Sequence, residues 1–458
     1  MNEGRKEEHN KDKYLQRKRL QMKPAKKDAG IVLPLLSESP EGEKNSDDAS
    51  VSGAVFNVST TIIGAGIMSI PATLKVLGVI PAIGLILIIA VLVDVSVEFL
   101  LRFTHSGESR TYAGVMAESF GRFGSVAVQI SVMITNLGAL IIYLIIIGDV
   151  LSGSLSEGSV HLGVLQEWFG VHWWNSRAFA LLFIVMFVML PLLLLRRVES
   201  LRFTSAISVL LAVVFVGISS VMAIVALCQG KTESPRLLPD LPSQASIFNL
   251  FTAVPVIVTA FTFHFNAELR QPSDMVSAVR ISLVLCAAIY IAVGFFGYLL
   301  FGDSIMTDIL VNFDQNYGST IGSLLNDTVR LSYALHLMLV FPLLNFSLRI
   351  NIDELLFPKR PLLASDTTRF VLLTCILLAL IYLAAITIPN IWYFFQFMGS
   401  TTAVCLAFIF PGAIVLRDLH GISTRRDRIL AAMMIILAVV TSSIAISTNV
   451  SSLIGTNL

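Results

Sequence analysis

Charged side chains are scarce in this sequence. Asp, Glu, Lys and Arg together make up 14% of the 458 residues, whereas hydrophobic residues make up 55%. A typical soluble domain carries about 25% charged residues, and the mean hydropathy of +0.79 also lies on the apolar side. The composition therefore excludes a soluble globular protein. It predicts a polytopic membrane protein whose fold class is all-α.

Cysteine and histidine are also few, and neither type has the spacing that a cofactor would require. The four cysteines have no metal or redox spacing, so no disulfide framework is expected. The seven histidines are scattered without the paired spacing of a metal site, and no nucleophile is accompanied by an evident base. We therefore expect no cofactor, no metal, no nucleic-acid partner and no enzyme activity.

A polytopic membrane protein can be a transporter or, as the main alternative from a different class, an ion channel. Channel selectivity needs a re-entrant filter or rings of like charge in an oligomer. Neither pattern is found in the sequence. A secondary transporter is therefore favoured over a channel.

The first 50 residues differ from the rest of the chain because they are rich in charge. A basic run between Lys11 and Lys27 precedes an acidic run between Glu38 and Asp48. Segregated charge with little apolar content predicts a disordered tail over residues 1–50, which we place in the cytosol.

Long apolar runs make up most of the remaining chain. About 20 apolar residues span the ~30 Å hydrocarbon core of a bilayer, and eleven runs after residue 50 are of spanning length. They begin with residues 53–71 and continue at 79–103, 123–152, 178–195, 201–228, 247–265, 277–301, 328–348, 367–388, 391–416 and 429–448. The sequence therefore predicts eleven transmembrane helices.

The positions of lysine and arginine predict the orientation of these helices. With the tail in the cytosol, the basic residues on the outer side are Lys75, Arg177, Lys231, Arg236 and Arg330, and all others fall on the inner side. This bias follows the positive-inside rule. An odd number of spans then places the C-terminus in the lumen or outside the cell.

Ten of the spans divide into two halves of five. We predict a first repeat over residues 51–228, an outer loop over 229–246 and a second repeat over 247–416; residues 417–458 add an inner loop, an eleventh helix and a short outer tail. Five spans per half make the second half insert upside down relative to the first, as in inverted-repeat secondary transporters. The symmetry follows from span number and helix irregularity alone, because no residue-level repeat relates the halves.

The first apolar run carries small and hydroxyl residues in the middle of the membrane. Gly64 and Gly66 flank Ala65, and Thr60 and Thr61 precede them by one turn. In hydrocarbon, a helix can open only where the opening faces a protein-lined cavity. The pattern therefore predicts a discontinuous helix at a transport site. Alternatively, the glycines only let a neighbouring helix approach closely.

The sixth apolar run is irregular in the same way. Pro255 removes a backbone donor in mid-span, and Thr259, Thr262 and His264 add polar groups. Interrupted first helices in both halves indicate that the substrate binds between them.

Other intramembrane polar residues allow two interpretations. Asp94 lies roughly 12 Å deeper than Arg102, and both a functional and a structural role fit it. Glu98 is four residues from both Asp94 and Arg102, so the three charged side chains lie on one helix face that leads to the membrane interface. This structural role explains Glu98 better than a functional one. Further residues suit either a cavity lining or hydrogen bonds between helices, namely Asn136, Tyr143, Ser332, His336, Gln396, Ser400, Thr401 and Thr402.

Several motifs resemble the amino acid/auxin permease family. They are Gly53-Ala-Val-Phe-Asn57 with Ile63-Gly-Ala-Gly-Ile-Met-Ser-Ile-Pro71, then Phe261-Thr-Phe-His-Phe-Asn266, and Val329-Arg-Leu331 with Phe341-Pro342. The chain is similar first to plant amino acid transporters of the vacuolar type and next to sodium-coupled neutral amino acid transporters. The resemblance implies a leucine-transporter-like fold with 5+5 inverted repeats plus one extra helix. It also implies amino acids as substrate and a vacuolar or other endomembrane location.

Within such a fold, the opened helices indicate how an amino acid is held. Amides freed near Gly64–Ile67, together with a half-helix dipole, suit a carboxylate, and carbonyls freed near Thr259–Phe263 suit an ammonium group. The expected substrate-binding residues are Thr60, Thr61, Gly64, Ala65, Gly66, Thr259, Phe261, Thr262 and Phe263.

A proton is favoured over sodium as the coupling ion. The sodium-coupled relatives that the chain resembles use a hydroxyl between the Val-Arg-Leu and Pro motifs, but the run Leu335–Val340 has none. Ser332, one turn earlier, and Asn57 keep sodium as the alternative. His264 can change charge near neutral pH, although it equally suits a neutral side chain bonded to a carbonyl. Asp94 is a second candidate proton carrier.

Overall fold

The computed structural model describes most of the chain after residue 50. The described residues are 51–109, 111–156, 159–194, 199–232, 234–240, 244–263, 272–314, 320–358, 360–361, 363–388 and 391–454. The charged tail over residues 1–50 lies outside them, so its disorder stays a prediction. Every described residue belongs to the second of two units into which the chain divides, Pro34–Leu458.

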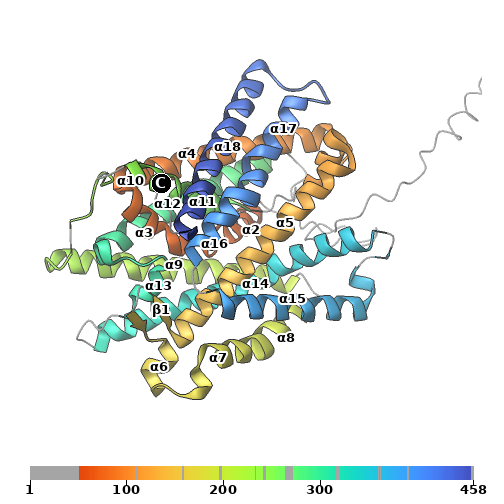
Figure 1. Ribbon diagram of the computed structural model, residues 1–458. Helices are drawn as coiled ribbons and strands as arrows, with labels where there is room; N and C mark the ends of the chain where they lie inside the picture. The colour runs from red at the N-terminus through yellow and green to blue at the C-terminus, as the bar shows by residue number, and fades with distance from the viewer. Residues whose placement is uncertain are drawn as a thin grey trace, which may run out of the picture. The chain divides into compact units, whose positions relative to one another are not determined.

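The second unit consists of helices joined mostly by short loops (Figure 1). Its first part contains α2 (Val51–Ile62), α3 (Gly66–Leu77), α4 (Val79–Ser106), α5 (Tyr112–Ser152), α6 (Val164–Phe169), η1 (Trp173–Asn175), α7 (Arg177–Ile184), η2 (Val185–Met189), α8 (Leu190–Leu194) and α9 (Glu199–Cys228). Its second part contains α10 (Gln244–Phe251), α11 (Ala253–Phe261), α12 (Pro272–Phe301), η3 (Gly302–Ser304), α13 (Ile309–Asn312), α14 (Thr320–Leu356), η4 (Leu363–Ser365), α15 (Thr367–Thr387), α16 (Ile391–Met398), η5 (Gly399–Ala403), η6 (Cys405–Ile409), α17 (Phe410–Arg417) and α18 (Arg425–Ile454).

A small β-hairpin stands between α5 and α6. Its strands β1 (Ser154–Ser156) and β2 (Ser159–His161) pair antiparallel. In the described part of the chain, the prediction of an all-α protein is correct apart from this hairpin.

The long helices follow the predicted apolar runs in order. Nine described segments are long and apolar enough to cross a membrane, and α2 with α3 makes a tenth if the bent pair is one span. The sixth predicted run, 247–265, is described as the shorter apolar helix Ile247–Phe261, and residues 264–271 after it lie outside the described residues. The helical membrane protein is thus confirmed, whereas the count of eleven spans stays a prediction.

The outward faces of these helices are apolar. Exposed hydrophobic side chains of this number on a folded protein mark a surface that contacts lipid rather than water. Examples from different helices are Val91, Phe187, Leu210, Val284 and Ile436.

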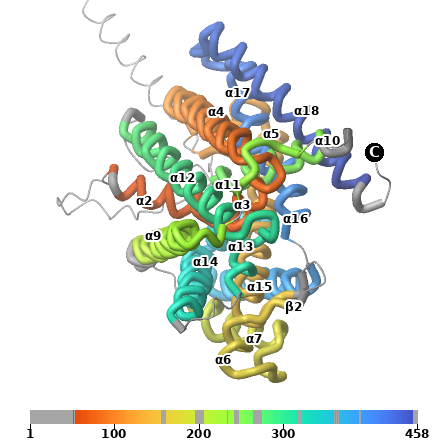
Figure 2. Tube along the Cα trace, turned by 90° about the vertical axis from the view of Figure 1, so that its left-hand side faces the viewer, coloured from red at the N-terminus to blue at the C-terminus, as the bar shows by residue number. Residues whose placement is uncertain are grey.

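Helices α12 and α14 organise the packing around the first broken helix. Helix α14 packs against α5 and α9, and α12 packs against α2, α3, α4 and α9 (Figure 2). The aromatic side chains of Tyr290 on α12 and of Tyr333 and Phe341 on α14 are completely buried. Such large side chains contribute much of the buried area of a core. The two tyrosines also carry hydroxyls to the α2–α3 junction.

Helix α3 is tied to the loop that follows α12. The Ser69 hydroxyl donates to the carbonyl oxygen of Thr307 at 2.8 Å. The Lys75 ammonium donates to the carbonyl oxygen of Ile305 at 3.3 Å. The loop and the C-terminal half of the first broken helix therefore form a connected unit.

Candidate functional site

The first predicted helix is broken where its glycines predict it. Helices α2 and α3 meet at an angle of 56° around Ile63–Ala65. A Cβ added at Gly66 would lie 2.6 Å from the Cα atom of Ala260 on α11, and one added at Gly64 would collide with the Tyr143 hydroxyl. Opening of the helix and close approach of its neighbours therefore both occur at these glycines.

Three successive backbone carbonyls at the break are held by buried side chains. The Tyr290 hydroxyl lies 2.7 Å from the carbonyl oxygen of Ile62. Nε2 of His336 lies 2.9 Å from the carbonyl oxygen of Ile63, and the Tyr333 hydroxyl donates to that of Gly64 at 2.7 Å. Because a buried carbonyl without a donor is costly, α12 and α14 replace the helical hydrogen bonds that the break removes.

At the second predicted break, α11 ends at Phe261, and residues 264–271 lie outside the described residues, so a helix broken there stays a prediction. The backbone leaves the helical conformation at Thr262, which has φ −78° and ψ 123°. The hydroxyls of Thr259 and Thr262 donate to the carbonyl oxygens of Pro255 and Val258 of the same helix, each at 2.8 Å. The Tyr290 hydroxyl lies 2.7 Å from the carbonyl oxygen of Ala260, so one side chain contacts both broken helices.

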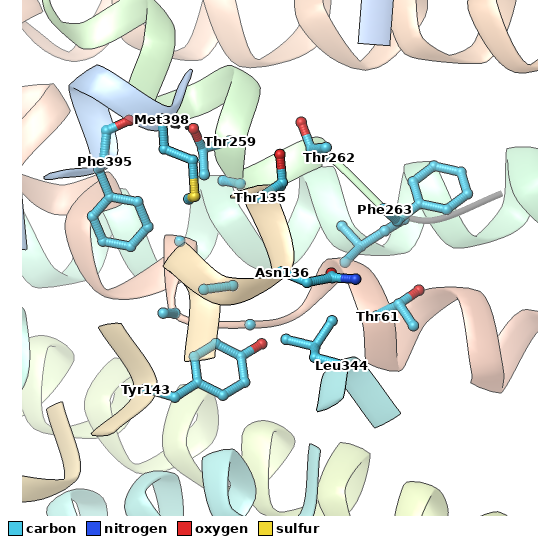
Figure 3. A pocket seen from close by; sticks show the side chains of 16 residues that line it. Thr61, Thr135, Asn136, Tyr143, Thr259, Thr262, Phe263, Leu344, Phe395 and Met398 are labelled. Carbon is cyan, nitrogen blue, oxygen red and sulfur yellow. Dashed lines mark hydrogen bonds between the residues drawn. The ribbon is translucent and has the colours of Figure 1, made fainter. Parts of the chain in front are cut away.

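A cavity lies where the two breaks meet (Figure 3). Its volume is about 50 Å³, and one buried water needs roughly 10–15 Å³ on this measure, so it suits a small molecule. The lining comes from the first break (Thr61, Ile62, Gly64, Ala65, Gly66), from α5 (Thr135, Asn136, Ala139, Tyr143), from α11 and the residues after it (Thr259, Ala260, Thr262, Phe263), and from Leu344, Phe395 and Met398.

Seven of the nine residues expected to bind substrate line this cavity, namely Thr61, Gly64, Ala65, Gly66, Thr259, Thr262 and Phe263. The other two lie beside it. The Thr60 hydroxyl donates to the carbonyl oxygen of Phe56 at 2.8 Å. The Phe261 ring packs edge-on against Tyr290, with 5.0 Å between ring centroids. Both side chains are buried in the protein rather than in the cavity wall.

Several lining residues come from helices that are far away in the sequence. Asn136 and Tyr143 on α5 stand out in the sequence as polar groups within an apolar run, and Figure 3 shows Asn136 near the middle of the cavity. Nothing in the sequence distinguishes Thr135 from other hydroxyl residues in apolar runs. Its hydroxyl donates a hydrogen bond to the Thr402 hydroxyl at 2.8 Å. The apolar lining residues, Ala139, Leu344, Phe395 and Met398, cannot be distinguished by type from ordinary core residues.

The candidate coupling residues in the described part of the chain lie on three different helices, α2, α4 and α14. Asp94 on α4 pairs with Arg280 on α12 at 3.2 Å. Ser332 donates to the carbonyl oxygen of Val329 at 3.0 Å on its own helix. Asn57 is half-buried on α2, one to two turns before the break. His264 lies outside the described residues.

The described cavity lining offers polar groups without full charges. It combines threonine hydroxyls, the Asn136 amide and the Tyr143 hydroxyl with backbone groups at the two breaks. Backbone amides at the start of a helix suit an anionic group, and carbonyls at the end of a helix suit a cationic one. Together they suit a small zwitterion.

Comparison with known proteins agrees with this geometry. Residues 47–453 match the family described as transmembrane amino acid transporter protein. Amino acid transporter AVT6C of Arabidopsis thaliana is 62% identical over 428 residues, which are 92% of this chain and 98% of that protein. Sodium-coupled neutral amino acid transporter 4 of Homo sapiens is 26% identical over 430 residues, which are 79% of this chain and 77% of that protein.

Solved structures share the fold at low sequence identity. The crystal structure of MhsT in complex with L-phenylalanine aligns with a TM-score of 0.53 and 13% identity, over 88% of this chain and 99% of that chain. A mutant manganese transporter of Eremococcus coleocola aligns with a TM-score of 0.57 and 13% identity, over 89% and 88% of the two chains. These likenesses confirm a leucine-transporter-like fold and nothing finer. The chain belongs to the transmembrane amino acid transporter protein family.

Proposed function

We propose that the protein is a secondary active transporter that moves amino acids across a membrane by alternating access. The observation that carries this proposal is the cavity at the meeting point of two broken helices, with freed backbone groups of opposite polarity on its walls. Family membership supports amino acids as the substrate class.

The amino acid is held mainly by backbone groups in this proposal. Its carboxylate binds amides at Gly64–Ile67, and its ammonium group binds carbonyls at Thr259–Phe263. Thr61, Thr259 and Thr262 supply hydroxyls close to these groups. Asn136 and Tyr143 on α5 add an amide and a hydroxyl to the cavity wall, and the Tyr143 hydroxyl lies next to Gly64 at the first break.

A proton is our proposed coupling ion, and sodium is the second candidate. Sodium requires several oxygen ligands, but the carbonyl oxygens of Ile62, Ile63 and Gly64 each lie within 2.9 Å of a polar atom of a buried side chain. The sodium-coupled name of the 26% identical human relative is the observation that favours sodium. The test is amino acid uptake into sealed vesicles with imposed ion gradients. Uptake that requires sodium and does not respond to a pH gradient would identify sodium as the coupling ion. His264→Ala in the same assay tests whether this histidine carries the proton.

The membrane topology extends the same proposal. It comprises eleven helices in 5+5 inverted repeats plus one, a cytosolic N-terminus, a lumenal C-terminus and residence in the vacuolar membrane. The outer loop over 229–246 then separates the repeats 51–228 and 247–416. Protease protection of tags at either end, in isolated vacuoles, tests both the sidedness and the location.

Exchange of labelled for unlabelled amino acids across reconstituted liposomes tests the function directly. Losing one hydrogen bond to a charged substrate group costs about 1.5–3 kcal/mol, so Thr262→Ala is expected to raise the half-saturation concentration roughly ten- to a hundredfold. Thr60→Ala is the matched control, because the Thr60 hydroxyl bonds within α2 outside the cavity. Equal effects of the two substitutions would refute the placement of the site, and single-channel currents without exchange would indicate a channel.

A further inference from the structure

His336 is a buried histidine that joins three helices. It belongs to α14 and is 0% exposed. Its Nε2 lies 2.9 Å from the carbonyl oxygen of Ile63 at the α2–α3 break. Its Nδ1 lies 2.7 Å from the carbonyl oxygen of Ser208 on α9 and 2.8 Å from the hydroxyl of the same residue. Both ring nitrogens therefore have partners within the protein.

These partners satisfy two protonation states of the ring. A neutral ring with its hydrogen on Nε2 donates to the Ile63 carbonyl, and its Nδ1 accepts from the Ser208 hydroxyl. A charged ring donates from both nitrogens, to the carbonyl of Ile63 and to that of Ser208. Carbonyl oxygens only accept, so both can be bonded at the same time only by the charged ring. Rotation of one hydroxyl converts the surroundings from one state to the other.

The groups around the ring do not fix its charge. The Tyr333 ring on α14 lies 4.8 Å away between centroids. On α12, the titratable groups that face the break are Tyr290 and the buried Cys286. The polar atoms within hydrogen-bond distance of the ring are the carbonyl oxygens of Ile63 and Ser208 and the Ser208 hydroxyl. Protonation is therefore governed by the two carbonyls, the hydroxyl and access of water.

We propose that His336 binds and releases the proton that is coupled to transport, an inference that rests on the proposed amino acid transport. The proton adds to the lone pair of Nδ1, the Ser208 hydroxyl turns away, and the same proton leaves Nδ1 when helix movement admits water from the other side. A hydronium ion on one side gives up the proton, so its O–H bond breaks as the N–H bond forms, and a water molecule on the other side takes the proton when the N–H bond breaks.

The position of Ile63 explains how the proton and the substrate influence each other. Ile63 directly precedes Gly64, and Gly64, Ala65 and Gly66 line the cavity. Charging His336 strengthens its hydrogen bonds, because bonds from a charged donor are roughly twice as strong as neutral ones. The charged ring thus holds the break to α9 and α14 more firmly, and the amides that face the substrate are held with it.

His336→Gln tests this role in liposomes, because glutamine keeps a donor and an acceptor but cannot take a charge. We expect exchange of labelled amino acid without a gradient to persist, while stimulation of net uptake by a pH gradient and the signal of a trapped pH dye are lost. His105→Gln is the matched control, since His105 is exposed near the end of α4, and should behave as wild type. Undiminished stimulation in His336→Gln would overturn the proposal.

Ser208→Ala gives an independent test if His336→Gln does not fold. Alanine keeps the carbonyl that accepts from the charged ring but removes the hydroxyl that serves the neutral one. A neutral hydrogen bond contributes about 0.5–1.5 kcal/mol, so the pH of half-maximal stimulation should move up by as much as ~1 unit. An unchanged midpoint would overturn the proposal. A wild-type protein that exchanges no amino acid would refute the proposed transport itself, whereas intact exchange that ignores pH would refute the coupling role alone.

Discussion

Substitution of Gly66 by alanine probes the contact between the two broken helices. The added Cβ would lie 2.6 Å from both the Cα and the Cβ atoms of Ala260, whereas ordinary contact begins at 3.4 Å. Backbone on α11 has no rotamer to move, so α3 and α11 must separate by roughly 1 Å. Overpacking of this kind costs about 1–3 kcal/mol, and a ~1 Å displacement of binding groups can lower a rate about 10²-fold.

We therefore expect Gly66→Ala to reduce exchange in liposomes at least tenfold and to lower the thermal unfolding temperature in detergent. Gly84→Ala on α4 is the matched control, because nothing lies within 4 Å of a Cβ added there. Alanine in a helix interior is favoured over glycine by up to ~1 kcal/mol, so the control should be at least as stable as wild type. Wild-type exchange by Gly66→Ala would refute the argument that the α3–α11 contact shapes the site.

Two further predictions concern buried polar groups. Tyr290→Phe removes the hydroxyl that lies 2.7 Å from the carbonyl oxygens of Ile62 and Ala260. Because an unsatisfied buried acceptor costs about 1–3 kcal/mol, the unfolding temperature of this variant should fall below that of Tyr393→Phe, whose side chain is exposed. Equal unfolding temperatures of the two variants would contradict this prediction. Burial, together with repulsion from Asp149, raises the pKa of Asp308 from its ordinary 3.8 to about 8. The folded protein then keeps a proton that the unfolded chain releases, so this group makes stability fall as pH rises between 3.8 and about 8. Asp308→Asn keeps the side-chain oxygen that accepts from the Leu310 amide and should flatten that fall in a thermal-shift series; an unchanged slope would count against the buried neutral acid.

The helix breaks can be predicted from the sequence because their causes are local. Glycine at positions 64 and 66 weakens a helix whatever surrounds it, and the break after α2 appears at these two glycines. Pro255, by contrast, lies inside α11, which continues to Phe261. The positions of the long helices can also be predicted from the sequence, because each helix coincides with a local run of apolar residues. Helix α5 is kinked at Gly121, which has φ +66°. The predicted apolar run begins at residue 123, directly after this kink.

The partners of the break cannot be predicted in this way because they depend on packing between distant helices. Ile63 and His336 are 273 positions apart in the chain, and nothing local to either residue indicates the contact. The same holds for the faces of broken helices: Thr60 and Thr61 are neighbours, yet only Thr61 lines the cavity. The rotation of α2 relative to its neighbours decides which of the two adjacent hydroxyl residues lines the cavity. The types of amino acid in α2 do not specify this rotation.

The bonds from Ser69 and Lys75 to the loop after α12 bear on how the protein opens. A neutral hydrogen bond contributes about 0.5–1.5 kcal/mol and one from a charged group about 1.5–3 kcal/mol, so the two together hold α3 to the loop by only a few kcal/mol. An equilibrium constant changes tenfold for every ~1.4 kcal/mol. The two bonds together therefore favour the joined arrangement of α3 and the loop over a separated one by roughly one to three factors of ten.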